Sequence, residues 1–160
     1  MVHDQRFLRA YEGREGDAEN GARMTVYEAE GGEKEIRIAG SPAWRNNNPG
    51  NLRPSKYNKR QIGSAWGFAV FGSREDGLAA MKDLLRRPVY ARLSLERAMY
   101  RYAPPADNNP THAYLDYVSR RSGVGFDVRL GSLDAYRLDE VVTAMMAFEG
   151  QKVGRVRREV

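Results

Sequence analysis

The sequence predicts an α+β protein that is mainly helical, with a small β element in its N-terminal half. Four segments, residues 73–87, 94–102, 110–122 and 134–149, carry apolar residues at helical spacing, whereas strand-like patterns are confined to residues 24–38 and 66–71. At 160 residues, with 41% hydrophobic and 29% charged residues, the chain has the size and composition of one soluble domain.

The N-terminal half is predicted to hold a short helix, a hairpin, a loop and a strand. Residues 4–12 place Phe7, Leu8 and Tyr11 at a spacing that suits a short helix. Apolar and polar residues alternate on both sides of a Gly-Gly pair at 31–32, which predicts a β-hairpin. Residues 44–53 are rich in Asn, Pro and Gly and predict a structured polar loop, and residues 66–71 predict a short strand.

The C-terminal half is predicted to hold the helices, each with start and stop signals. Ser73 suits the N-cap of a first helix that ends near Arg87, before a proline. The second begins at Ser94 and ends before Ala103-Pro104-Pro105. The third follows Asn109-Pro110 and ends at Gly123, and the fourth runs from about Asp134 to Glu149.

Composition and charge limit the classes of function. The absence of cysteine excludes disulfides and thiolate metal sites, and His3 and His112 are too isolated for a zinc hydrolase. A net charge of +5 favours a polyanionic partner, either nucleic acid, anionic lipid or the bacterial cell wall. Because the basic residues are dispersed, nucleic acid is the least favoured. No stretch suits a secretory signal or a membrane span, so we expect cytoplasmic synthesis and delivery by another component.

One carboxylate interrupts the apolar pattern of the last helix. Leu138, Val142 and Met145 share one face, and Glu149 follows on that face in the last turn. Desolvation and the negative end of the helix dipole would both favour its protonated form and raise its pKa. A glycosidase needs such a group to protonate the leaving oxygen at neutral pH, and a Glu in an apolar pocket can serve as that acid. The alternative is a Glu that turns outward into water at a frayed helix end.

Candidate substrate-binding residues are amides and tyrosines. Amide groups of Asn46, Asn47, Asn48 and Asn51 could bind sugar hydroxyls, or they could instead bond one another within a turn. Tyr102 and Tyr114 could stack on pyranose rings, although their spacing also suits a buried core. Asn108 is a further candidate for substrate binding.

Four motifs in one order resemble a known family. The runs WRNNNPGNLR, GFAVFGSREDGLAAMKDLL, RYAPPADNNPTHAYLDYV and AMMAFEG resemble phage lysins and virion-associated muramidases, which also occur as domains of type VI secretion effectors. The resemblance covers about residues 40–151. Phe148 and Gln151 depart from it, because members often have a His or basic residue before the Glu and an aromatic residue after the Gly.

The resemblance implies a fold, a reaction and a division of the chain. It implies a lysozyme-like fold in residues 41–160, circularly permuted so that the catalytic helix is last, with residues 1–40 as an N-terminal extension. It implies cleavage of peptidoglycan between N-acetylmuramic acid and N-acetylglucosamine, without a cofactor, with Glu149 as the general acid. The site of action would be the periplasm or cell wall, reached through a virion or secretion carrier, and a secreted toxin would require an immunity protein.

Two questions stay open at this level. With a second carboxylate, for which Glu75, Asp76 and Asp107 are candidates, the product would be a reducing sugar; without one, an anhydro sugar would result. The alternative function is a non-catalytic cell-wall-binding component of a virion or secretion apparatus.

Overall fold

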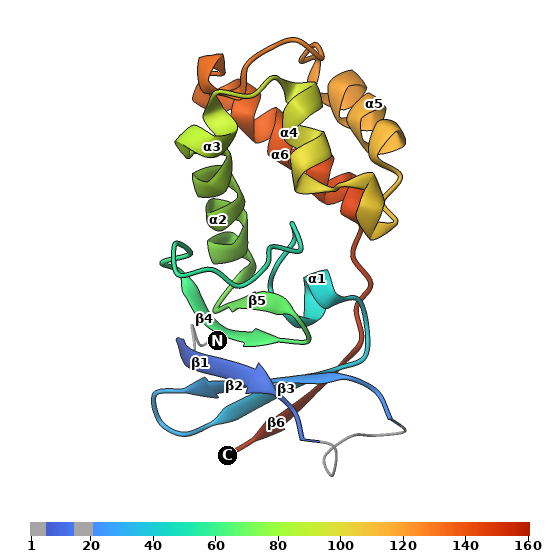
Figure 1. The fold of residues 1–160 in the computed structure, drawn as a ribbon. Helices are drawn as coiled ribbons and strands as arrows, with labels where there is room; N and C mark the ends of the chain where they lie inside the picture. Colours follow the sequence, from blue (N-terminus) through green and yellow to red (C-terminus); the bar gives the residue numbers. More distant parts are fainter. Residues whose placement is uncertain (1–5, 15–20) are drawn as a thin grey trace. The chain divides into compact units, whose positions relative to one another are not determined.

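The computed structural model describes residues 6–14 and 21–160, which form two compact units (Figure 1). Of the described residues, the sheet unit comprises 6–14, 21–80 and 150–160, and the helical unit comprises 81–149. The boundary falls within one helix, α2 (Arg74–Arg86).

The sheet unit is built on a mixed six-stranded sheet with strand order β5-β4-β1-β2-β3-β6. All pairs are antiparallel except β1 with β4, which run parallel and meet at Ala10 and Gly63. The strands are β1 (Phe7–Glu12), β2 (Met24–Ala29), β3 (Lys34–Ile38), β4 (Gln61–Ala65), β5 (Phe68–Phe71) and β6 (Arg155–Glu159).

The prediction of a mainly helical, lysozyme-like fold with only a small β element is wrong. The sheet has six strands and includes segments from near both ends of the chain, so strand pairing organises one of the two units. The last helix is also followed by a strand, β6, which pairs with β3 through five residues of each. Long-range pairing of this kind leaves little trace in local periodicity, because its partners are distant in sequence.

The predicted helix over residues 4–12 is also wrong, since Phe7–Glu12 form strand β1. Within β1, Ala10 is buried, whereas Leu8 is 52% exposed. The spacing of Phe7, Leu8 and Tyr11 therefore does not mark one buried helical face. Backbone pairing with β2 on one side and β4 on the other decides the conformation.

The predicted hairpin is confirmed. β2 and β3 pair antiparallel from Met24–Ile38 to Glu28–Lys34, and Gly32 in the turn has a φ of 89°, which suits glycine. One face of this hairpin buries an apolar cluster of Met24, Val26, Ile36 and Ile38. The opposite face contributes Tyr27 to a second cluster with Ala10, Ala65 and Val70. The sheet unit therefore buries apolar side chains on both sides of its central strands.

The four helices predicted in the C-terminal half are confirmed. Ser73 accepts a hydrogen bond from the Asp76 amide at the start of α2, and Ser94 caps α4 through the Arg97 amide. The third predicted helix ends as expected at Gly123, which has a left-handed φ of 73°. Besides α2, the helices are α1 (Pro42–Arg45), α3 (Pro88–Ala91), α4 (Leu95–Tyr102), α5 (Thr111–Ser122) and α6 (Ala135–Glu149), with short 3-10 turns η2 (Pro105–Asp107) and η3 (Leu130–Ser132).

In the helical unit, α5 packs against both α4 and α6 (Figure 1). Every helix in the described part of the chain is too short or too polar to span a bilayer. Strands β1, β2 and β3 share one sheet with β4 and β6, and the division at residue 40 into an extension and a catalytic domain stays a prediction.

Candidate active site

Helix α6 carries Glu149 as its final residue. The apolar stripe predicted from the sequence is present, because Leu138, Val142 and Met145 are at most 4% exposed. Glu149 is half-buried, and Gly150 ends the helix with a φ of 75°. Glu149 therefore lies in the last turn of α6, four residues beyond the buried Met145.

Aromatic packing connects the end of α6 to α5. The ring of Phe148 stacks on that of Tyr114, with centroids 4.5 Å apart and ring planes 24° apart. Tyr117, one turn along α5, contacts the same Phe148 ring at 5.5 Å. Tyr114 is only 2% exposed, so this contact lies in the interior of the helical unit. The stacking limits the freedom of the α6 terminus and hence of Glu149.

The phenol groups of Tyr102 and Tyr114 lie in the electrostatic surroundings of Glu149. Burial, followed by the charge of Glu149, holds the pKa of Tyr102 well above its usual value. Burial, the neighbouring Tyr102 phenol and interaction with the Glu149 carboxylate raise the pKa of Tyr114. The side chain of Tyr102 is half-buried, and its hydroxyl is enclosed. Three predicted site residues from three helices, α4, α5 and α6, are therefore brought together.

The chemistry available to this cluster is proton transfer. A half-buried carboxylate can give or take a proton, and neutral phenols can donate hydrogen bonds to its ionised form or to a sugar hydroxyl. Both phenols are protonated at neutral pH, since tyrosine ionises only near pH 10 and their pKa values are raised further. The cluster thus has the groups that acid catalysis of glycoside cleavage requires, with one carboxylate.

The asparagine loop, residues 46–51, lies in the sheet unit and is largely buried. Asn46, Asn47 and Asn48 are 0%, 6% and 0% exposed. The Asn47 side chain accepts from Arg37 at 2.8 Å and donates to the Phe71 carbonyl at 3.1 Å. The Asn48 amide group donates to the carbonyls of Leu52 and Ala69, both at 2.9 Å. These amides hold the loop against β5, and sugar binding by Asn47 and Asn48 stays a prediction.

The other predicted site residues are more open. Asn51 is half-buried with a left-handed φ of 52°, and Glu75 is exposed in the first turn of α2. Both belong to the sheet unit, whereas Glu149 belongs to the helical unit. Asn108 is exposed at the end of η2, six residues after Tyr102 and in the same unit as Glu149. The role of Glu75 as a second carboxylate stays a prediction.

Sequence reasoning missed the part played by Phe148. In the sequence this residue stands out only as a departure from a family pattern, yet its ring is the contact between α6 and Tyr114. The sequence offered one signal, the position of this aromatic residue. Phe148 directly precedes Glu149 on a helix that already carries an apolar face. Only the packing of α5 showed what the ring contacts.

Within residues 6–14 and 21–160, no group of three or more His, Asp or Glu side chains is placed to hold a metal ion. Comparison with models of known protein families finds no match, and comparison with curated proteins finds none either. The resemblance to lysins and muramidases is therefore a prediction from the motifs in the chain, and the cluster around Glu149 has to be judged by its own chemistry.

Proposed function

We propose that the protein cleaves the glycan strand of peptidoglycan between N-acetylmuramic acid and N-acetylglucosamine, with Glu149 as the general acid. The observation that carries this proposal is the half-buried Glu149 carboxylate beside two enclosed phenols at the end of α6. The basic net charge of +5 supports it further, because the wall is an acidic polymer.

In the proposed reaction, Glu149 protonates the glycosidic oxygen while positive charge develops on the muramic acid ring. The proton passes from the carboxyl group to the leaving oxygen as the glycosidic bond breaks. Either water or the 6-hydroxyl of muramic acid then attacks the ring carbon and gives up its proton to the Glu149 carboxylate, which leaves a reducing or an anhydro end respectively. Tyr102 and Tyr114 act as positioning residues, since both phenols lie close enough to Glu149 for its charge to contribute to their raised pKa values.

The test is digestion of purified sacculi by the wild type, Glu149→Gln and the control Glu140→Gln. Glu140 lies on the same helix, is half-buried and undergoes the same chemical change. We expect Glu149→Gln to lower the cleavage rate by at least about a hundredfold, and Glu140→Gln to retain it, because loss of a general acid removes proton transfer from the transition state. Mass spectrometry of the released fragments distinguishes the reducing from the anhydro end.

Two outcomes would contradict the proposal. Equal cleavage by wild type and Glu149→Gln would remove Glu149 from the mechanism. Binding of sacculi by all three proteins with no release of fragments would favour the alternative function, a non-catalytic wall-binding component of a virion or secretion apparatus.

A further inference from the structure

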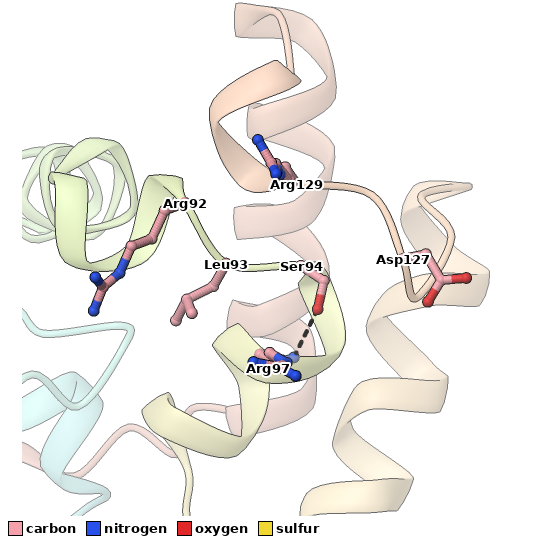
Figure 2. A pocket seen from close by; sticks show the side chains of 6 residues that line it. All are labelled: Arg92, Leu93, Ser94, Arg97, Asp127 and Arg129. Atoms are coloured by element: carbon pink, nitrogen blue, oxygen red, sulfur yellow. Dashed lines mark hydrogen bonds between the residues drawn. The ribbon is translucent and has the colours of Figure 1, made fainter.

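A pocket of about 460 Å³ lies in the helical unit, where α3 leads into α4 (Figure 2). Its lining comes from two stretches of chain, residues 92–97 and residues 127–129. The two stretches are joined by backbone hydrogen bonds, from Leu95 to Val128 at 2.8 Å and from Leu130 to Leu93 at 3.0 Å. The backbone around the pocket is therefore fixed by pairing. The residues that line it are Arg92, Leu93, Ser94, Arg97, Asp127 and Arg129.

Three arginines dominate the charge of this pocket. Arg92, Arg97 and Arg129 are exposed and come from the end of α3, the first turn of α4 and the residue before η3 (Figure 2). Among the residues that the structure describes, no carboxylate forms an ion pair with any of these three guanidinium groups. They can therefore bind an external anion without first breaking an internal salt bridge.

The start of α4 does not itself offer an anion site. Its first amides are already satisfied: Glu96 donates to the Phe126 carbonyl at 3.1 Å and Arg97 donates to the Ser94 hydroxyl at 3.2 Å. Recognition must therefore come from side chains. Planar guanidinium groups bind carboxylates through paired hydrogen bonds, which gives geometric selectivity as well as attraction.

Asp127 distinguishes between kinds of anion. It lines the same pocket but stands apart from the three arginines (Figure 2). A ligand with negative charge alone would be repelled by this carboxylate, whereas a ligand with several carboxylates and one ammonium group would match three guanidinium groups and one carboxylate. That pattern of charge is typical of an acidic peptide with a free amino group.

We propose that this pocket binds the acidic stem peptide of peptidoglycan, an inference that rests on the proposed function and names a second substrate contact. Tyr102, beside Glu149, is the last residue of α4, and Ser94 precedes the first. Eight helical residues rise about 12 Å. The pocket and the Glu149 cluster thus lie near opposite ends of one helix, so a glycan strand and the peptide branching from it could contact both.

The first measurement is calorimetric binding of soluble muropeptides, compared with the same sugars after an amidase has removed the peptide. The proteins are wild type, Arg97→Gln, Arg129→Gln and the control Arg120→Gln, which changes an exposed arginine of α5 outside the pocket. We expect peptide removal, Arg97→Gln and Arg129→Gln each to raise Kd by about tenfold, as loss of a charge-assisted hydrogen bond predicts, and Arg120→Gln to leave Kd unchanged.

Several outcomes would overturn the inference. One is wild-type affinity in both pocket variants, with unchanged thermal unfolding. Another is equal affinity for sugars with and without peptide. Inorganic phosphate or single-stranded DNA binding as tightly as the muropeptide, and competing with it, would reassign the pocket to a phosphate ligand. A failure of the proposed function can be distinguished from a failure of this inference. If muropeptide binding depends on Arg97 but sacculi are not cleaved, the pocket assignment stands and the proposed reaction is wrong.

Discussion

At the residue scale, the environment of Glu149 combines opposing effects. Its half-buried position and the helix C-terminus favour the neutral carboxyl group. A neutral phenol close to a carboxylate can instead favour its ionised form. Tyr114 is such a group, since burial, the neighbouring Tyr102 phenol and the charge of Glu149 together raise its pKa.

A tyrosine substitution tests this balance. If the Tyr114 phenol favours ionised Glu149, removing its hydroxyl in Tyr114→Phe should move the alkaline limb of the pH–activity profile to higher pH. The measurement is initial cleavage rate of sacculi across pH for wild type and variant. Tyr117→Phe is the control, because its hydroxyl contacts Arg121 and not Glu149. An unchanged limb in Tyr114→Phe would show that this phenol does not act on the acid.

The asparagine loop shows at the same scale that residue type alone leaves two roles open. Amide side chains suit sugar hydroxyls, but they suit backbone carbonyls equally well. Asn48 is fully buried and forms hydrogen bonds with the backbones of both Leu52 and Ala69, so its amide group stabilises the conformation of the loop. A buried amide without these partners would carry an unsatisfied polar group, which costs free energy.

At the element scale, the close approach of β1 and β4 controls the centre of the sheet. These strands pair at Ala10 and Gly63, and a Cβ atom on Gly63 would lie 1.9 Å from the Ala10 carbonyl oxygen. That distance is far below van der Waals contact. The carbonyl oxygen belongs to the backbone and the Cβ atom would be fixed to it, so neither atom could rotate away. The glycine is required because no side chain fits between the strands.

The corresponding prediction concerns Gly63→Ala. We expect it to lower the free energy of unfolding by about 1–3 kcal/mol or more, because the strands must separate to admit the methyl group. Urea denaturation followed by circular dichroism provides the measurement. Gly72→Ala is the control, since its Cβ would meet no atom closer than 3.7 Å. Equal stability of the two variants would contradict the pairing of β1 with β4.

At the scale of the whole molecule, buried tyrosines link stability to alkaline pH. Burial raises the pKa of Tyr27, Tyr102 and Tyr114, and burial with the Glu28 hydrogen bond raises that of Tyr11 to about 12. Tyrosine ionises near 10 in an unfolded chain. Their contribution to stability is therefore complete below about pH 10 and is lost as the pH rises towards the folded-state values.

We accordingly expect the free energy of unfolding to fall steeply above about pH 10, with part of the tyrosinate absorbance appearing only as structure is lost. Urea unfolding at increasing pH measures the slope. Tyr27→Phe should make the slope shallower, because Tyr27 is fully buried, whereas Tyr57→Phe, at a side chain that is 62% exposed, should not. Identical slopes in wild type and Tyr27→Phe would contradict this linkage.

The elements that could be predicted from the sequence are those marked by residues close together along the chain. The hairpin of β2 and β3 follows from alternation around two glycines, α4 begins at its Ser94 cap and α5 ends at Gly123, as predicted. The buried stripe of α6 and the position of Glu149 at its end were likewise readable from helical spacing. In each case the deciding interactions join residues close in sequence.

Tertiary structure decided the sheet and the surroundings of the candidate site. Nothing local marks Phe7–Glu12 or Arg155–Glu159 as strands, because each takes its conformation from partners far along the chain. The stacking of Phe148 on Tyr114 likewise depends on how α5 packs against α6. Strand pairing and aromatic packing bring together residues that are distant in sequence and that no periodic pattern links, so only the folded chain shows which groups are in contact.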